Sequence, residues 1–187
     1  MKKRYVILDR DGTIMLDKHY LADPAGVELE HGAVQGLKRL KKLGLGLVLV
    51  TNQSGLNRGY FGADSVEAIH GRLRELLAPH GVDFDGVYLC PHTPEEDCSC
   101  RKPRPGLIEQ AAAELGFDPA ECFVIGDKEC DVGLGRAVGA TTILVRTGKG
   151  VNHEPRCLDQ GLADHVADDL AEAAELVARL LGRPAQA

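Results

Sequence analysis

Two aspartates lie two residues apart at the end of a short apolar run, and their spacing could support metal or acid–base chemistry. Asp9 and Asp11 follow residues 5–8, a run typical of a buried strand in a parallel sheet. Open α/β sheets bind their ligands at the carboxyl ends of strands, and Gly12 allows the chain to turn there. Two carboxylates this close repel each other unless they share a cation or a proton. We therefore expect Mg²⁺, which prefers oxygen ligands and phosphates, although Asp and Gly are also common in simple turns.

A second group of residues could bind a different metal. A Cys-x-His pair and a Cys-x-Cys pair, separated by five residues, supply four soft ligands, enough for a closed tetrahedral zinc site. Such a site leaves no position for water, so we expect a structural zinc that holds an irregular loop. Reduced thiols or a disulfide are the alternatives. The candidate zinc ligands are Cys90, His92, Cys98 and Cys100. The other cysteines are scattered and are interpreted as ordinary thiols: Cys122, Cys130 and Cys157.

Polar groups that suit a phosphate follow other apolar runs. Thr51 follows one such run, and Asp127 follows another, where it could complete the metal site of the first aspartate pair. A hydroxyl and nearby backbone N–H groups can stabilise charge on a transferring phosphoryl group. Lys102 comes directly after the predicted zinc loop, which would position its charge. The alternatives are a turn or cap role for the threonine and a solvated basic surface for the lysine.

These residues need a sheet whose strand ends meet at one edge. Apolar runs predict strands at residues 5–8, 45–50, 86–89, 121–126 and 142–145. Helical spacing predicts helices at residues 33–44, 64–79, 105–116, a segment ending near 138, and 170–180. Asp64 has capping-box spacing and is predicted to be an N-cap. Residues 14–32 show neither the helical nor the strand spacing of apolar residues and are predicted to form a loop. The alternation of predicted strands and helices along the chain predicts an α/β fold, a Rossmann-like three-layer sandwich with a mainly parallel central sheet.

Length and charge exclude several classes of protein. The 187 residues fit one domain of common size, so a single domain is predicted over residues 1–187, with the zinc loop at 90–100. A net charge of −6 argues against a broad nucleic-acid-binding face. No apolar run approaches the length of a membrane span, and the basic start leads into a run too short for a signal-peptide core. We expect a cytoplasmic monomer that binds neither nucleic acid nor membrane.

The chain resembles the haloacid dehalogenase-like (HAD) phosphatases at four motifs. The matching segments are Asp9-x-Asp11-x-Thr13, Thr51, Lys102, and Gly126-Asp127-x-x-x-Asp131. The resemblance implies that Asp9 is the nucleophile and that Asp11 is the general acid/base. It also implies that Lys102 balances the charge of the nucleophile and the phosphoryl group. Asp9, Asp11 and Asp127 would hold Mg²⁺, and Asp131 would support the loop or the metal-bound waters.

Further segments favour a sugar bisphosphate substrate. They are residues 9–13, 51–55, 58–61, 90–92, 98–103, 126–128 and 146–150. Together they look like a branch of the family that removes one phosphate from a sugar bisphosphate during glycan biosynthesis, and the resemblance covers nearly all of residues 4–150. Histidinol phosphate is the alternative substrate. A non-catalytic zinc-stabilised module that binds phosphorylated ligands is a further alternative, but an anion-binding site gains nothing from two carboxylates.

Residues beside these motifs are candidates for substrate contacts. They are Asp17, Lys18, His19, Tyr20, Asn52, Gln53, Ser54, Arg58, Arg101 and Lys128. Arg58 could hold a second anionic group, because a guanidinium suits phosphate, or it could be a solvated surface residue. Glu129 and Cys130 depart from the residues usual in relatives, which leaves the role of their loop open.

Overall fold

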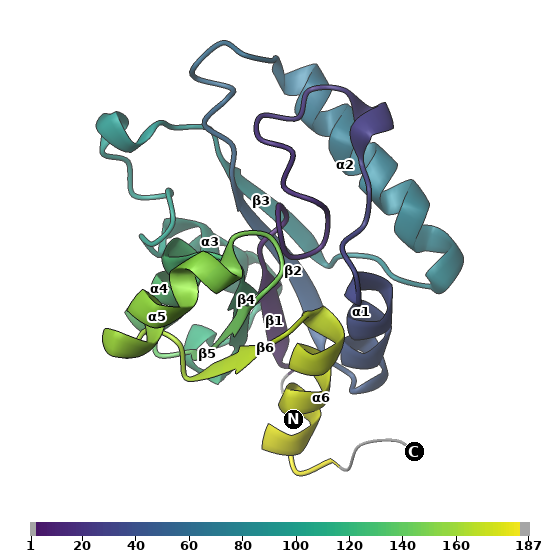
Figure 1. The fold of residues 1–187 in the computed structure, drawn as a ribbon, viewed down its shortest axis with the longest axis vertical. Helices are drawn as coiled ribbons and strands as arrows, with labels where there is room; N and C mark the ends of the chain where they lie inside the picture. Colours follow the sequence, from purple (N-terminus) through teal and green to yellow (C-terminus); the bar gives the residue numbers. More distant parts are fainter. Residues whose placement is uncertain (1–2, 184–187) are drawn as a thin grey trace.

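Six parallel strands form the central sheet of the computed structural model, which describes residues 3–183 (Figure 1). The strands are β1 (Tyr5–Leu8), β2 (Gly46–Asn52), β3 (Gly86–Cys90), β4 (Phe123–Gly126), β5 (Thr141–Val145) and β6 (His165–Ala167). Their order across the sheet is β3-β2-β1-β4-β5-β6, so β1 lies between β2 and β4. Every neighbouring pair is parallel, as expected for strands joined by crossover connections.

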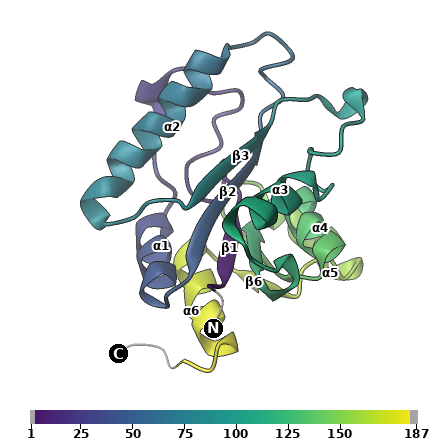
Figure 2. The ribbon, with the colours of Figure 1, turned by 180° about the vertical axis from the view of Figure 1, so that it is seen from behind.

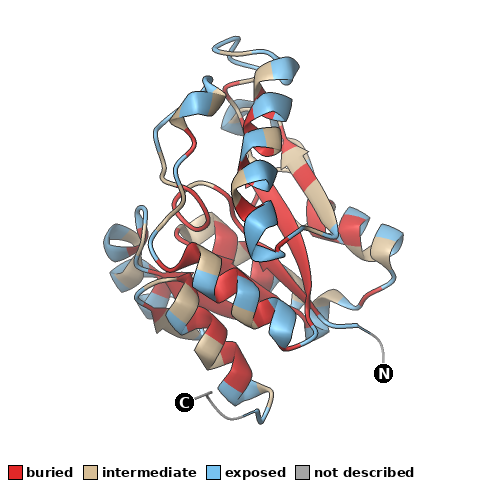
Figure 3. Cartoon of the chain, turned by 90° about the vertical axis from the view of Figure 1, so that its right-hand side faces the viewer, coloured by how far each residue is buried: buried red, intermediate tan, exposed pale blue. Residues whose placement is uncertain are grey.

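Each face of the sheet carries a hydrophobic core, because successive side chains of a strand point to opposite sides. Val6 and Leu8 of β1 pack in one core, and Tyr5 and Ile7 pack in the other. All four residues are buried, as expected for a central parallel strand covered on both faces. Figure 3 shows the buried sheet at the centre and the exposed outer surfaces of the helices around it.

Helices cover both faces of the sheet (Figures 1 and 2). They are α1 (Ala33–Lys42), α2 (Ala63–Leu77), α3 (Gly106–Leu115), α4 (Glu129–Val138), α5 (Gly150–Asp159) and α6 (Leu170–Leu180). Short 3₁₀ turns are η1 (Pro24–Gly26), η2 (Ala78–His80), η3 (Pro94–Glu96) and η4 (Pro119–Glu121). Helices α1, α2 and α6 pack in the core that contains Val6, whereas α3 and α4 pack in the core that contains Tyr5. Helix α5 packs against α4 and β5.

The parallel α/β architecture predicted from the sequence is confirmed. Two elements are not predicted by the sequence pattern, namely α5 and β6. Pro155 lies inside α5, where proline is normally unfavourable, and β6 has only three residues. The N-cap prediction is wrong, because α2 begins at Ala63 with Gly62 as its N-cap. Asp64 instead lies in the first turn, where its negative charge still suits the helix dipole.

The predicted domain range, residues 1–187, extends past the described part of the chain, since residues 1–2 and 184–187 lie outside it. Between residues 3 and 183, no helix is both long and apolar enough to cross a membrane. The carboxyl ends of the adjacent strands β2, β1 and β4 meet at one edge of the sheet, and the candidate site lies there.

Candidate active site

The adjacent strands β1 and β4 bring two carboxylates to the same edge of the sheet. Leu8 pairs with Ile125 in the strand register, and the N–H of Asp9 donates to the carbonyl of Ile125 at 3.0 Å. Asp9 follows β1 and is 7% exposed, and Asp127 follows β4 and is fully buried. Buried carboxylates are costly unless they are paired with positive charge or metal, so their partners determine what the site can do.

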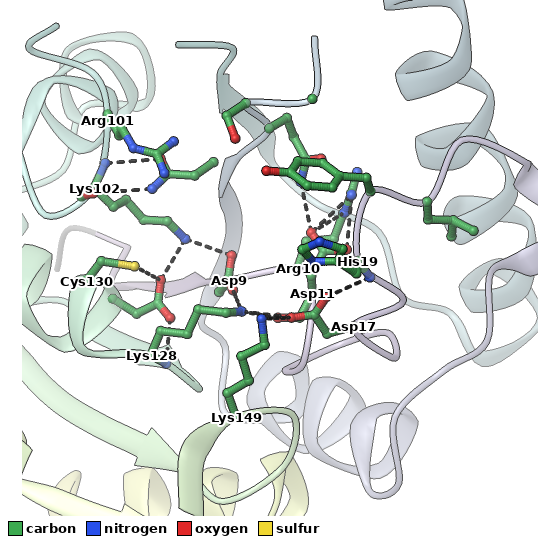
Figure 4. A pocket seen from close by; sticks show the side chains of 17 residues that line it. Asp9, Arg10, Asp11, Asp17, His19, Arg101, Lys102, Lys128, Cys130 and Lys149 are labelled. Carbon is green, nitrogen blue, oxygen red and sulfur yellow. Dashed lines mark hydrogen bonds and ion pairs between the residues drawn. The ribbon is translucent and has the colours of Figure 1, made fainter. Parts of the chain in front are cut away.

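Lys102 supplies one positive charge from the loop after the Cys/His cluster. Its Nζ lies 2.7 Å from Asp9 Oδ1 (Figure 4). The same Nζ lies 2.7 Å from Asp131 Oδ1. It also donates to the carbonyl of Val50 at 2.6 Å. Asn52, at the end of β2, holds the lysine's main chain by accepting from its N–H and donating to its carbonyl. Burial lowers the pKa of Lys102, but the charges of Asp131 and Asp9 outweigh burial and leave the pKa above its ordinary value.

Lys128 places a second ammonium group among oxygen atoms. Its Nζ lies 2.9 Å from Asp127 Oδ1 and 2.9 Å from the main-chain oxygen of Asp11. The same Nζ lies 3.7 Å from Asp9 Oδ2. Asp17 Oδ2 lies 3.6 Å from this Nζ. Oxygens from four residues therefore surround one ammonium group.

The carboxylates of the site have different affinities for protons. Burial raises the pKa of Asp9, but the charges of Lys102 and Lys128 outweigh it, so the pKa lies below its ordinary value. For Asp127, burial and then the charge of Asp9 raise the pKa to about 7. The local lysines therefore keep Asp9 ionised but do not neutralise the whole cluster. A divalent cation would favour the ionised form of Asp127 as well.

Three carboxylates form a group that could hold a metal. Single oxygens of Asp9, Asp127 and Asp131 all lie within 4.8 Å of one another. Asp131 is already engaged, because one oxygen contacts Lys102 and the other accepts from the N–H of Lys128. The carboxylate of Asp11, predicted as a metal ligand, does not belong to this group. The structure instead directs its main-chain oxygen to the site. This set of hard oxygen ligands fits Mg²⁺.

The side chain of Asp11 contacts a separate set of donors. Arg10 donates through Nε and Nη2 at 3.1 Å each, and Gln53 Nε2 donates at 2.8 Å. Gln53 Nε2 also donates to Thr51 Oγ1 at 2.7 Å. The predicted catalytic Thr51 is buried and does not line the cavity, so in this structure its hydroxyl is linked to Asp11 through Gln53.

A cavity of about 250 Å³ lies over these groups. Most of the predicted substrate-binding residues line it: Asp17, His19, Tyr20, Asn52, Gln53, Ser54, Arg101 and Lys128. Lys18 and Arg58 do not. Lys18 pairs with Glu28, and Arg58 lies 3.6 Å from Glu95, so carboxylates of neighbouring segments hold both side chains.

Among the residues that line the cavity, Arg10, Cys130 and Lys149 are not among the predicted substrate contacts. The N–H of Lys149 donates to Asp127 Oδ2 at 2.9 Å, and its Nζ lies 3.3 Å from Asp17 Oδ2. Lys149 lies in the loop after β5, so the strand-end argument could have identified it. Arg10 gives no such signal, because an arginine between two aspartates is normally expected at the surface. It is nevertheless only 2% exposed.

Two glycines allow loops to pack against Asp127. Gly12 and Gly148 have φ values of 87° and 57°, a region that favours glycine. A Cβ atom at Gly12 would lie 2.3 Å from Asp127 Oδ2, and one at Gly148 would lie 2.4 Å from the same oxygen. Glycine at both positions therefore lets the main chain approach this carboxylate closely.

The predicted zinc ligands meet in one cluster beside the cavity. They are Cys90, His92, Cys98 and Cys100, and their ligand atoms all lie within 4.8 Å of one another. His92 Nδ1 lies 3.2 Å from Cys100 Sγ, which lies 3.2 Å from Cys90 Sγ. Arg101 Nη1 donates to the carbonyl of His92 at 2.9 Å. The cluster could hold a metal, and this hydrogen bond ties it to the residue next to Lys102.

Comparison with known proteins identifies relatives of nearly full length. Residues 99–173 match the family model described as HAD-hydrolase-like. D-glycero-beta-D-manno-heptose-1,7-bisphosphate 7-phosphatase of Haemophilus influenzae is 41% identical over 183 residues, which are 94% of this chain and 97% of that protein. The protein of the same name from Pseudomonas aeruginosa is 37% identical over 182 residues, or 93% of this chain and 97% of that protein.

A solved structure shares the fold. The D,D-heptose 1,7-bisphosphate phosphatase from B. bronchiseptica, crystallised with magnesium and phosphate, is 35% identical to this chain. The TM-score is 0.85, and the alignment covers 95% of this chain and 99% of that one. Similarity in sequence and in three-dimensional structure therefore extends over almost the whole chain.

Proposed function

Because the chain belongs to the D-glycero-β-D-manno-heptose-1,7-bisphosphate 7-phosphatases within the HAD-like hydrolases, we propose that it removes the 7-phosphate of that sugar bisphosphate in a Mg²⁺-dependent reaction. The observation that carries the proposal is the ion pair of Asp9 and Lys102, which both line the cavity, together with a carboxylate oxygen of Asp127 within 4.8 Å of one of Asp9. The product would serve the synthesis of nucleotide-activated heptose for lipopolysaccharide or a related glycan.

The metal site of this proposal uses oxygens that already surround a cation. Asp9, Asp127 and the main-chain oxygen of Asp11, all of which lie near Lys128 Nζ, would hold Mg²⁺. When bound, Mg²⁺ offsets negative charge on the phosphoryl group. The raised pKa of Asp127, caused first by burial and then by Asp9, supports a need for further positive charge at this point.

The proposed nucleophile is Asp9. Its carboxylate oxygen attacks phosphorus, and the bond between phosphorus and the sugar's 7-oxygen breaks. Lys102, bound to the other carboxylate oxygen, keeps Asp9 ionised and fixes its orientation. The lowered pKa of Asp9, for which Lys102 and Lys128 outweigh the effect of burial, supports this role.

Asp11 is the proposed general acid/base. It gives a proton to the leaving 7-oxygen and then takes a proton from the water that attacks the aspartyl-phosphate on Asp9. That second step breaks the bond between Asp9 and phosphorus and releases inorganic phosphate. Uncatalysed phosphate monoester hydrolysis is so slow that the site must lower the barrier by more than ~20 kcal/mol. Nucleophile, acid/base and positive charges must therefore act together.

We propose that zinc occupies the cluster of three cysteines and one histidine. Four soft ligands that lie this close fit a closed tetrahedral site, and the site would hold the loop between β3 and Lys102 in place. Arg101, which lines the cavity and donates to His92, would then be positioned to contact substrate.

A phosphate-release assay with Mg²⁺ tests the substrate assignment. It compares heptose 1,7-bisphosphate, fructose 1,6-bisphosphate and histidinol phosphate at matched concentrations. We expect kcat/KM to be at least about tenfold higher for the heptose, with the 1-phosphate retained when the product is examined by ³¹P NMR. Equal kcat/KM values for all three compounds would contradict the substrate assignment. A preference for histidinol phosphate would favour the alternative, and no release from any of them would favour a binding module.

A further inference from the structure

Arg10 is a buried cation whose guanidinium contacts the carboxylate of Asp11 and not that of Asp9. The carboxylate of Asp9 contacts Lys102 and Lys128, whereas that of Asp11 contacts Arg10 and Gln53. Although Arg10 stands between the two aspartates in the chain, its guanidinium turns to Asp11 and binds it through two nitrogens, Nε and Nη2. A bidentate contact of this kind restricts both the position and the rotation of a carboxylate.

The third nitrogen of the guanidinium has a partner on another element. Arg10 Nη1 lies 3.1 Å from Nε2 of His70, a residue of α2 that is only 7% exposed. An arginine nitrogen can only donate, so Nε2 of His70 must be the acceptor, and the ring must be neutral with its proton on Nδ1. The side chains of His70, Arg10 and Asp11 thus form a continuous chain from helix α2 to the cavity.

We propose that His70 is a positioning residue for Asp11, acting through Arg10. The inference rests on the proposed function, in which Asp11 protonates the leaving oxygen. If His70 could not accept, Arg10 Nη1 would be left without this partner in a buried position, which is costly, and the guanidinium would shift to find another. The two hydrogen bonds from Arg10 to Asp11 would then shift as well, and Asp11 would be displaced. Small displacements of a catalytic group lower the rate strongly.

The dependence on the leaving group separates this role from a purely structural one. An alkyl phosphate such as heptose 1,7-bisphosphate needs a proton on its leaving oxygen, whereas p-nitrophenyl phosphate releases a stable anion and does not. The quantity to compare is kcat/KM, because it reports on events up to release of the leaving group and not on later hydrolysis of the aspartyl-phosphate.

The test uses His70→Leu, which cannot accept, and His70→Gln, whose amide oxygen can. For His70→Leu we expect kcat/KM to fall about 10- to 100-fold on heptose 1,7-bisphosphate and to stay within about threefold on p-nitrophenyl phosphate. His70→Gln should recover most of the lost activity. Thermal melting of both variants checks that they are folded.

An equal loss on both substrates would overturn the inference, since damage to the fold lowers both rates together. A folded His70→Gln variant as impaired as His70→Leu would also overturn it. If the unaltered protein hydrolyses neither substrate, the proposed function itself fails, and this result differs from either outcome of the variants.

Discussion

The two carboxylates of the Asp9-x-Asp11 pair lie close in sequence but have separate partners. Two lysines hold Asp9 in its ionised form, whereas Arg10 and Gln53 orient Asp11. Separate partners allow the two carboxylates to be oriented independently of each other. This arrangement supports different roles for two residues of the same type.

Because His70 is buried in its neutral form, we expect the free energy of unfolding to depend on pH. Burial first, and then the charges of Arg10 and Arg74, lower the pKa of His70 from 6.5 to about 4. Between these values the unfolded chain binds a proton that the folded chain does not. The stabilising effect of a neutral His70 is therefore complete above pH 6.5 and is lost as the pH falls toward 4. The shift corresponds to about 3 kcal/mol at most.

Urea unfolding of the unaltered protein and of His70→Gln at pH 5 and pH 7 measures this effect. The loss of stability from pH 7 to pH 5 should be larger in the unaltered protein than in the variant. The comparison between variants is needed because Asp127, whose pKa is raised to about 7 by burial and by Asp9, contributes with the opposite sign in both. Parallel pH profiles would show that His70 is not held neutral.

Residues of the site can be predicted from the sequence where they directly follow an apolar run. Asp9 and Asp127 directly follow apolar strands, so their meeting at one sheet edge follows from a parallel sheet. The connection between Arg10 and His70 gives no local signal, since the two residues are 60 positions apart and belong to different elements. It depends on how α2 packs, which the sequence pattern does not reveal.

At the scale of elements, the packing of α1 against α6 depends on a glycine. A Cβ atom at Gly36 would lie 2.3 Å from the carbonyl oxygen of Leu170 and 2.5 Å from its carbonyl carbon. Main-chain atoms cannot move aside as a flexible side chain can. We expect Gly36→Ala to destabilise the fold by about 1–3 kcal/mol, although alanine is the better helix former.

Gly71 of α2 provides the matched control. Nothing lies within 4 Å of a Cβ atom at this position, so Gly71→Ala should stabilise the protein by about 0.5–1 kcal/mol. Urea unfolding of both variants measures the difference. A neutral or stabilising Gly36→Ala substitution would contradict the close contact between α1 and α6.

The proposed zinc in the Cys/His cluster predicts that the stability of its loop depends on that metal. Cys98→Ser removes one of four ligands, so zinc content should fall to near zero and the melting temperature should drop by at least about 4 °C, which equals roughly 1–2 kcal/mol for a chain of this size. Cys122→Ser is the control for zinc content, which should stay unchanged because this thiol lies outside the cluster. An unchanged melting temperature in Cys98→Ser would argue that the metal is dispensable.

The elements themselves were predictable to different degrees. The cluster follows from four residues within eleven positions, so local spacing is sufficient to identify it. Helix α5 contains Pro155, and α2 begins before Asp64, which has the spacing of a cap without being one. In both cases the surrounding tertiary structure outweighs a local preference.

At the scale of the whole molecule, the order of the strands creates the site. Strand β1 lies between β2 and β4. The carboxyl ends of these three strands bring the Asp9 and Asp11 pair, Asn52 with its hydrogen bonds to Lys102, and Asp127 to one edge. The alternation of strands and helices was sufficient to predict a parallel sheet. It does not specify the strand order or the orientation of side chains in the loops, which depend on packing over long sequence separations.

The central claim is that Asp9 attacks phosphorus, and the turnover of Asp9→Asn measures it most directly. Phosphate release from heptose 1,7-bisphosphate with Mg²⁺ should fall at least about 1000-fold, with a melting curve that still shows a folded protein. Asp159→Asn, an exposed aspartate at the end of α5, should retain full activity. Turnover of a folded Asp9→Asn variant within a few-fold of the unaltered protein would contradict the account.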